Sequence, residues 1–151
     1  MAVAVRLPEV PPGCPDQDGL GRVGGQIGSQ PGRRQDGTCY ASEAVRRGAV
    51  ETWRIDNVRA SMPHPMHIHG FQFRVLDRRG SPAQVRTLAG ADGLLPQDLG
   101  LLDTVHVWPG ESVRIALDFT HPYAGDQDYV FHCHNLEHAE AGMMIRYRVK
   151  G

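Results

Sequence analysis

The chain has 151 residues, and its 16 Lys and Arg against 17 Asp and Glu give a formal net charge of −1. Hydrophobic residues make up 40% and charged residues 22%, both ordinary for a globular protein of one domain with a tail. The balanced charge gives no reason to expect nucleic acid or an anionic membrane as a partner, and no apolar run is long enough to span a bilayer.

Residues 1–36 differ from the rest, because proline and glycine interrupt them throughout and their apolar residues show no period. Such a stretch cannot bury enough apolar surface to offset its chain entropy, so we predict a disordered tail or linker over 1–36. A linker at the start of a chain without a recognisable secretory signal fits a piece of a larger protein. The spacing of Cys14 and Cys39 leaves open whether they pair in a disulfide.

From 37 to 151 the sequence alternates apolar and polar side chains in short runs separated by glycine and proline. Alternation with a period of two is typical of half-buried strands. It predicts strands at 50–57, 71–75, 104–108, 113–119, 128–133 and 144–149. No amphipathic helix of ten residues is evident, so we predict an all-β domain over 37–151, built as a β-sandwich.

Six of the eight histidines fall in two short clusters. The first cluster reads HPMHIHG from His64 to Gly70. The second reads HCHNLEH from His132 to His138 and is followed by Met143. Imidazole, thiolate and thioether ligands in such density favour a transition metal over magnesium or calcium.

The second cluster has the ligands of a blue-copper site, which uses two imidazoles and a thiolate near one plane with a weak axial thioether. Cys133, His138 and Met143 supply three of these ligands from one stretch of chain. The other imidazole must come from a neighbouring strand, and His64 is the candidate. Zinc also accepts sulfur and nitrogen ligands, but it has no use for a methionine at this spacing, so we predict copper.

The other cluster histidines predict a second metal position behind the first. Successive side chains of a strand point to opposite faces, so His132 and His134 point away from Cys133, while His67 and His69 share one face. The backbone joins His132 and His134 directly to Cys133, which gives electrons a short covalent route between the two positions.

These motifs resemble those of the multicopper oxidases, a family that includes laccases, cuprous oxidases and bilirubin oxidases. The clusters fit the family patterns HPxHxHG and HCHxxxHxxxxM, and the similarity covers about residues 36–151. The resemblance implies a cupredoxin-like Greek-key sandwich, the last domain of such an enzyme. It also implies three groups of copper ligands: His64, Cys133, His138 and Met143 for a type 1 copper, His67 for a type 2 copper, and His69, His132 and His134 for a type 3 pair. The type 1 copper would take single electrons from a small reducing substrate, and the His-Cys-His segment would pass them to a trinuclear copper site that reduces O2 to water.

The chain departs from the family in its histidine count. The trinuclear site of the family takes eight histidines, four of them from His-x-His motifs in the first domain. Here His-x-His occurs only at 67–69 and 132–134, which leaves half of that site. His106 is expected to be structural within its strand, and His121, beside Pro122, is expected to be solvated.

Three interpretations remain. In the first, the chain is part of a laccase-like oxidase, inactive in isolation, and an N-terminal cupredoxin domain or chain supplies four more histidines. In the second, it is a stand-alone blue-copper electron-transfer or copper-binding module, which leaves the histidines of the second position unexplained. In the third, two copies join their half-sites. The family resemblance implies a periplasmic or extracellular location.

Overall fold

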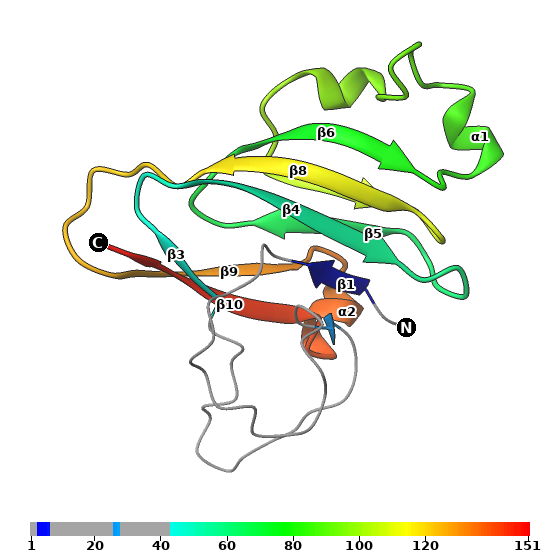
Figure 1. The fold of residues 1–151 in the computed structure, drawn as a ribbon. Coiled ribbons are helices and arrows are strands. Elements are labelled where there is room, and N and C mark those ends of the chain that lie inside the picture. The colour runs from blue at the N-terminus through cyan, green and yellow to red at the C-terminus, as the bar shows by residue number, and fades with distance from the viewer. Residues whose placement is uncertain (1–2, 7–25, 28–42) are drawn as a thin grey trace.

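Two five-stranded sheets form the protein in a computed structural model, which describes residues 3–6, 26–27 and 43–151 (Figure 1). The first sheet has the order β2 (Gln26–Ile27), β1 (Val3–Arg6), β4 (Val50–Asn57), β8 (Ser112–Asp118), β6 (Phe73–Arg79). The second has the order β3 (Glu43–Arg46), β10 (Met144–Lys150), β9 (Gln127–Cys133), β5 (His64–Ile68), β7 (Thr104–Val107). The described helices are short: α1 (Ala83–Arg86), the 3-10 helix η1 (Pro96–Leu99) and α2 (Leu136–Glu140). The all-β, cupredoxin-like prediction is confirmed.

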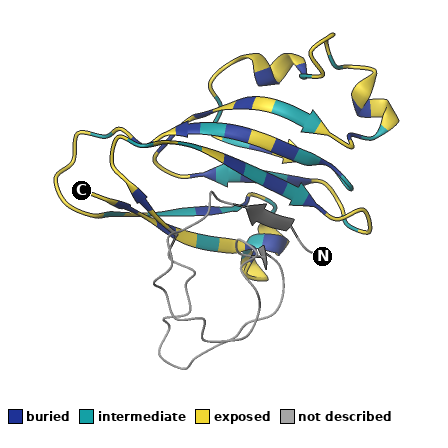
Figure 2. Cartoon of the chain, in the orientation of Figure 1, coloured by how far each residue is buried: buried dark blue, intermediate teal, exposed yellow. Residues whose placement is uncertain are grey.

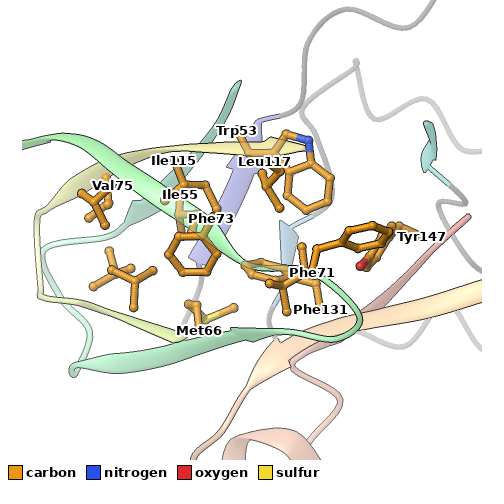
Figure 3. Packing of buried hydrophobic residues seen from close by; sticks show 14 of the residues in the cluster. Trp53, Ile55, Met66, Phe71, Phe73, Val75, Ile115, Leu117, Phe131 and Tyr147 are labelled. Atoms are coloured by element: carbon orange, nitrogen blue, oxygen red, sulfur yellow. The ribbon is translucent and has the colours of Figure 1, made fainter. Parts of the chain in front are cut away.

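The core lies between the two sheets, because the long strands bury alternate side chains over much of their length. Along β8 the buried residues are Val113, Ile115 and Leu117, and Figure 2 shows their bands alternating with more exposed ones. Side chains of both sheets meet in Figure 3, where Trp53 lies among the core residues. Its indole is fully buried and contacts the Tyr147 ring edge-on at a centroid distance of 5.6 Å.

An irregularity in β6 turns one charged side chain into the interior. The pairing of β6 with β8 shifts between Val75 and Asp77, so Leu76 is an extra residue in the ladder. Asp77 then pairs opposite exposed Arg114, and Arg78 pairs opposite buried Val113. The bulge therefore directs the Arg78 side chain inward, where only 2% of it is exposed.

The Arg78 guanidinium ties three segments together. It donates two hydrogen bonds to Asp98 of η1, of 2.6 and 2.9 Å, and one of 3.0 Å to Glu111 before β8. A further bond of 3.0 Å goes to the backbone carbonyl of His106 in β7. Burial lowers the pKa of Arg78, but its bonds to Asp98 and Glu111 outweigh that effect and raise it. The residues of this cluster fix the long connection between β6 and β7, which has little regular structure of its own.

Several predicted strands are present in the structure with shifted boundaries. The strand expected at 71–75 is Phe73–Arg79, and the one expected at 104–108 ends at Val107. Most of the predicted 1–36 tail lies outside the described residues, although Val3–Arg6 pairs with β4. Cys14 and Cys39 lie outside them too. Within the described part of the chain no helix has the length and apolar character to cross a membrane.

Candidate metal centre

The two histidine clusters meet because β5 and β9 are antiparallel neighbours in the second sheet. Met66 lies opposite Cys133, and His67 lies opposite His132. The first of these pairs is fully buried, and the second is only partly buried. The ladder therefore presents Cys133 to the core side and His132 to the other side, as the alternation of side chains requires.

His64, Cys133 and His138 converge on the buried side; with Met143 beside them, we call these residues the cysteine site. The Nδ1 atoms of His64 and His138 are 3.1 Å apart. The Cys133 Sγ atom lies 3.6 Å from the first nitrogen and 3.5 Å from the second. The His64 side chain has no exposure and His138 is 7% exposed.

The short helix α2 returns His138 to the end of β9. The chain leaves β9 after Cys133, turns through Asn135, and His138 lies in the middle of α2. Met143 is then tied to both ligand segments, because its amide donates to the His138 carbonyl (2.9 Å) and its carbonyl accepts from the Cys133 amide (3.0 Å). Its side chain is buried, 4% exposed. The number of residues between the cysteine, histidine and methionine of the HCHxxxHxxxxM motif is thus what this turn requires.

The surroundings favour uncharged histidine and a protonated thiol in the metal-free protein. Burial, and after it the nearby His138, lower the pKa of His64 to about 4. Burial raises the pKa of the Cys133 thiol, and a backbone hydrogen bond from Asn135 partly offsets the rise. A metal ion needs neutral imidazole and thiolate, so its binding must displace the thiol proton.

The three donors fit a trigonal metal ion. With bonds of about 2.0 Å to nitrogen and about 2.3 Å to sulfur, planar trigonal ligands stand about 3.5 to 3.7 Å apart. The observed separations of 3.1, 3.5 and 3.6 Å come within a few tenths of an ångström of that spacing. Two imidazoles, one thiolate and a neighbouring thioether are the donor set of a blue-copper site.

A second group of candidate ligands, which we call the histidine cluster, lies on the other face of the ladder: His67, His69, His132 and His134. The Nε2 atoms of His69 and His132 are 3.0 Å apart, and His67 completes a set of three whose donor atoms lie within 4.8 Å of one another. The His134 ring stacks beside His132 at a centroid distance of 5.4 Å but is outside that set of three. Burial and the neighbouring histidines lower the pKa of His69.

Two rings of the histidine cluster have one nitrogen held by the protein, which leaves the other for a metal. His67 Nδ1 lies 3.0 Å from the Asp103 carbonyl and 2.9 Å from Thr104 Oγ1. His132 Nδ1 lies 2.9 Å from the carbonyl of Cys133. Such bonds orient ligating imidazoles. The contact of His67 with Thr104 had no signal in the sequence motif.

Gly70, the last residue of the first cluster, packs against the ring of Tyr129. Its φ is +80°, and a Cβ placed there would overlap the Tyr129 ring. Tyr129 stacks on Tyr147, whose hydroxyl donates a 2.5 Å hydrogen bond to the His69 carbonyl. The glycine therefore lets the chain turn beside His69 while the tyrosines pack underneath.

We expect Gly70→Ala to lower the free energy of unfolding by more than the about 1–3 kcal/mol that a strained backbone conformation alone costs. The matched control is Gly93→Ala, because Gly93 has the same φ of +80° but open space around its Cβ position. Urea unfolding of both variants separates strain from overlap. Equal losses in the two variants would contradict the packing role of Gly70.

The two histidines outside the clusters have different surroundings. His106 is exposed on β7 and its ring stacks with Trp108 at 6.4 Å, away from both groups of ligands. The solvated state expected for His121 is wrong: the residue is partly buried, and both ring nitrogens are buried and have no hydrogen-bond partner among the described residues. The ring lies near Phe71 and Tyr123, which a sequence pattern around Pro122 does not reveal.

A β-sandwich that buries two histidines and a cysteine (His64, Cys133 and His138) beside a methionine defines a cupredoxin-type domain suited to copper. The sequence profile described as "Multicopper oxidase" matches residues 22–151. A laccase of Bacillus stratosphericus is 38% identical over 110 residues, covering 68% of this chain and 21% of that protein. A laccase of Haloferax volcanii is 41% identical over 106 residues, covering 68% and 16%. The crystal structure of the McoA multicopper oxidase of Aquifex aeolicus superposes with a TM-score of 0.62 at 46% identity, covering 74% of this chain and 22% of that one.

The chain belongs to the multicopper oxidase family, as its motifs predicted. It spans about a fifth of the length of these relatives.

Proposed function

We propose that the chain is the electron-accepting cupredoxin domain of a laccase-like oxidase. In this proposal the cysteine site holds a type 1 copper, and the histidine cluster supplies half of the ligands of a trinuclear copper site. When bound, copper supplies reversible one-electron redox chemistry, which lets single electrons from a small reducing substrate be collected for the reduction of O2 to water.

One observation supports this proposal most strongly: two groups of metal ligands lie on opposite faces of one ladder and share a single stretch of backbone. Cys133 belongs to the buried group, and its chain neighbours His132 and His134 belong to the other group. His132 is also hydrogen-bonded to the Cys133 carbonyl. A simple copper carrier would need the first group alone.

The chain's own residues then have distinct tasks. The Cys133 sulfur and the Nδ1 atoms of His64 and His138 form the electron-accepting position inside the core, where burial excludes water. Met143, the residue before β10, is held next to this position by its backbone hydrogen bonds to Cys133 and His138. The bonds between Cys133 and its two flanking histidines carry the electron across the sheet. His67, held by Asp103 and Thr104, keeps its other ring nitrogen for the second position.

The missing ligands are assigned to a partner surface. We propose that an N-terminal cupredoxin domain or chain brings four more histidines to the polar pocket of about 490 Å³ that is lined by His67 and His69. Asp103 and Asp118 also line this pocket. From the family resemblance alone, we also propose that the protein is exported, periplasmic or extracellular.

The first experiment loads the purified chain with Cu(II) and records its visible spectrum and copper content. An intense blue thiolate-to-copper band with one copper per chain supports the cysteine site, and a folded, reduced protein without that band contradicts it. The second experiment adds an N-terminal fragment with two His-x-His motifs and measures oxygen uptake with a phenolic substrate. No uptake from a copper-replete complex contradicts the oxidase assignment.

We expect the double variant His67→Ala/His69→Ala to keep the blue band, because both side chains lie on the face away from Cys133. Oxygen uptake by the assembled complex should disappear, because the second copper position loses two ligands. Optical spectra and an oxygen electrode measure the two effects separately. A matched variant is His106→Ala, which removes an exposed histidine outside both groups.

The alternative function is a stand-alone blue-copper electron-transfer or copper-binding module, which the fit of the three donors favours. In that case the histidines of the cluster bind no copper, and His67→Ala/His69→Ala leaves the copper content unchanged under all loading conditions. If instead two copies join their half-sites, the chain alone binds more than one copper and sediments as a dimer.

A further inference from the structure

Ser61 makes a hydrogen bond to the buried imidazole of His64. Its Oγ atom lies 2.9 Å from His64 Nε2, on the side of the ring opposite the cysteine site. The other nitrogen, Nδ1, faces Cys133 and His138. His64 has no solvent exposure, so Nε2 depends on the protein for its partner, and the described part of the chain provides Ser61.

The segment that carries Ser61 is fixed by a buried side chain at the end of β4. The Asn57 amide donates 2.8 Å to the Met62 carbonyl and 2.9 Å to the Val107 carbonyl of β7. Asn57 is itself 4% exposed, and its backbone is bonded to Gly110 and Glu111. Ser61, one residue before the anchored Met62, is therefore placed by two strands that flank the His64 segment.

A neutral imidazole carries one N–H, and the position of that proton decides which nitrogen can bind a metal. With the proton on Nε2, His64 donates to Ser61 Oγ, and Nδ1 presents its lone pair to the cysteine site. With the proton on Nδ1, the Ser61 hydroxyl donates instead, and an N–H points at the position that a metal would take. Both arrangements satisfy the 2.9 Å contact, but only the first forms a ligand.

We infer that Ser61 is a positioning residue that accepts the Nε2–H of His64 and holds this ring as a preformed metal ligand. The inference rests on the proposed type 1 site. It has a consequence for His138, whose Nδ1 lies 3.1 Å from that of His64. If His64 presents a lone pair, then His138 carries its proton on Nδ1 in the metal-free protein.

The direct test uses nitrogen-15 NMR of the metal-free 151-residue chain, in which the ring nitrogens of His64 and His138 report their tautomers. We expect the Nε2–H form for His64 and the Nδ1–H form for His138. An Nδ1–H form for His64 in the unsubstituted protein overturns the inference, whatever the variants do.

The variants Ser61→Ala and Ser61→Thr test the same bond through metal affinity. Removing a partner that orients a ligating histidine commonly weakens metal binding by about 10- to 100-fold. We expect Ser61→Ala to lose Cu(II) affinity by this amount, to show a mixed His64 tautomer and to shift the blue band. We expect Ser61→Thr to restore all three. Competition with a chelator measures the affinities. Ser112→Ala, in the other sheet, is the control for loss of a serine hydroxyl and should leave them unchanged.

The outcomes separate this inference from the proposed function. Unchanged affinity, spectrum and tautomer in Ser61→Ala overturn the role of Ser61 and leave the copper site standing. Absence of a blue band in the unsubstituted chain contradicts the copper site, and the tautomers in the metal-free protein still decide whether Ser61 holds His64.

Discussion

Arg78→Ala is expected to remove about 3–5 kcal/mol from the free energy of unfolding, the usual effect of breaking a buried ion pair by deleting one partner. Arg78 is the cation between Asp98 and Glu111, whose side chains have no exposure, so its loss leaves two buried carboxylates facing each other. The loss is a large share of the 5–15 kcal/mol that stabilises a typical protein. Chemical denaturation at neutral pH measures it.

The control is Arg114→Ala, on the same pair of strands. Arg114 pairs with Asp77, but its side chain is 45% exposed, and water screens such an exposed pair, so its loss should change the stability little. The two substitutions remove the same kind of side chain, so the difference between them isolates burial. Similar losses in both variants would show that the Arg78 cluster does not hold the β6–β7 connection.

Arg78 also shows where sequence reasoning stops. The alternation of β6 predicts that Phe73 and Val75 face the core, and they do. Continued without interruption, the same period would turn Arg78 outward. The extra residue Leu76 shifts the alternation by one residue, so the side chains after it change faces, and only the pairing with β8 reveals this.

The candidate metal ligands were predictable because their relation is local. Alternation within one strand separates Cys133 from His132, and the four-residue spacing to His138 is the length of one short turn. The one long-range step was to expect the second imidazole from a neighbouring strand, with His64 as the candidate, and the structure brings His64 beside Cys133 and His138. Its supporting partner Ser61 and the anchor Asn57 were beyond prediction, because an isolated serine or asparagine before a strand carries no periodic signal.

Cys133→Ser is expected to abolish the blue band and to weaken Cu(II) binding more than the about 10- to 100-fold that loss of a supporting hydrogen bond costs. The thiolate is the ligand that gives the intense absorption, and a serine hydroxyl stays protonated where a thiol gives up its proton. Serine is close to cysteine in size, so this fully buried position should still fold, which near-ultraviolet circular dichroism checks.

His132→Ala is the informative companion, because it alters the residue directly before Cys133. If closeness in sequence to Cys133 decided which residues matter for the blue band, Cys133→Ser and His132→Ala should both abolish it. The register of β5 and β9 indicates otherwise: Cys133 faces Met66 in the core, and His132 faces His67 on the other side. We therefore expect His132→Ala to keep the blue band and to lose oxygen uptake in the assembled complex. A blue band lost in both variants would mean that the two ligand groups act as one site, and would contradict the division of labour across the sheet.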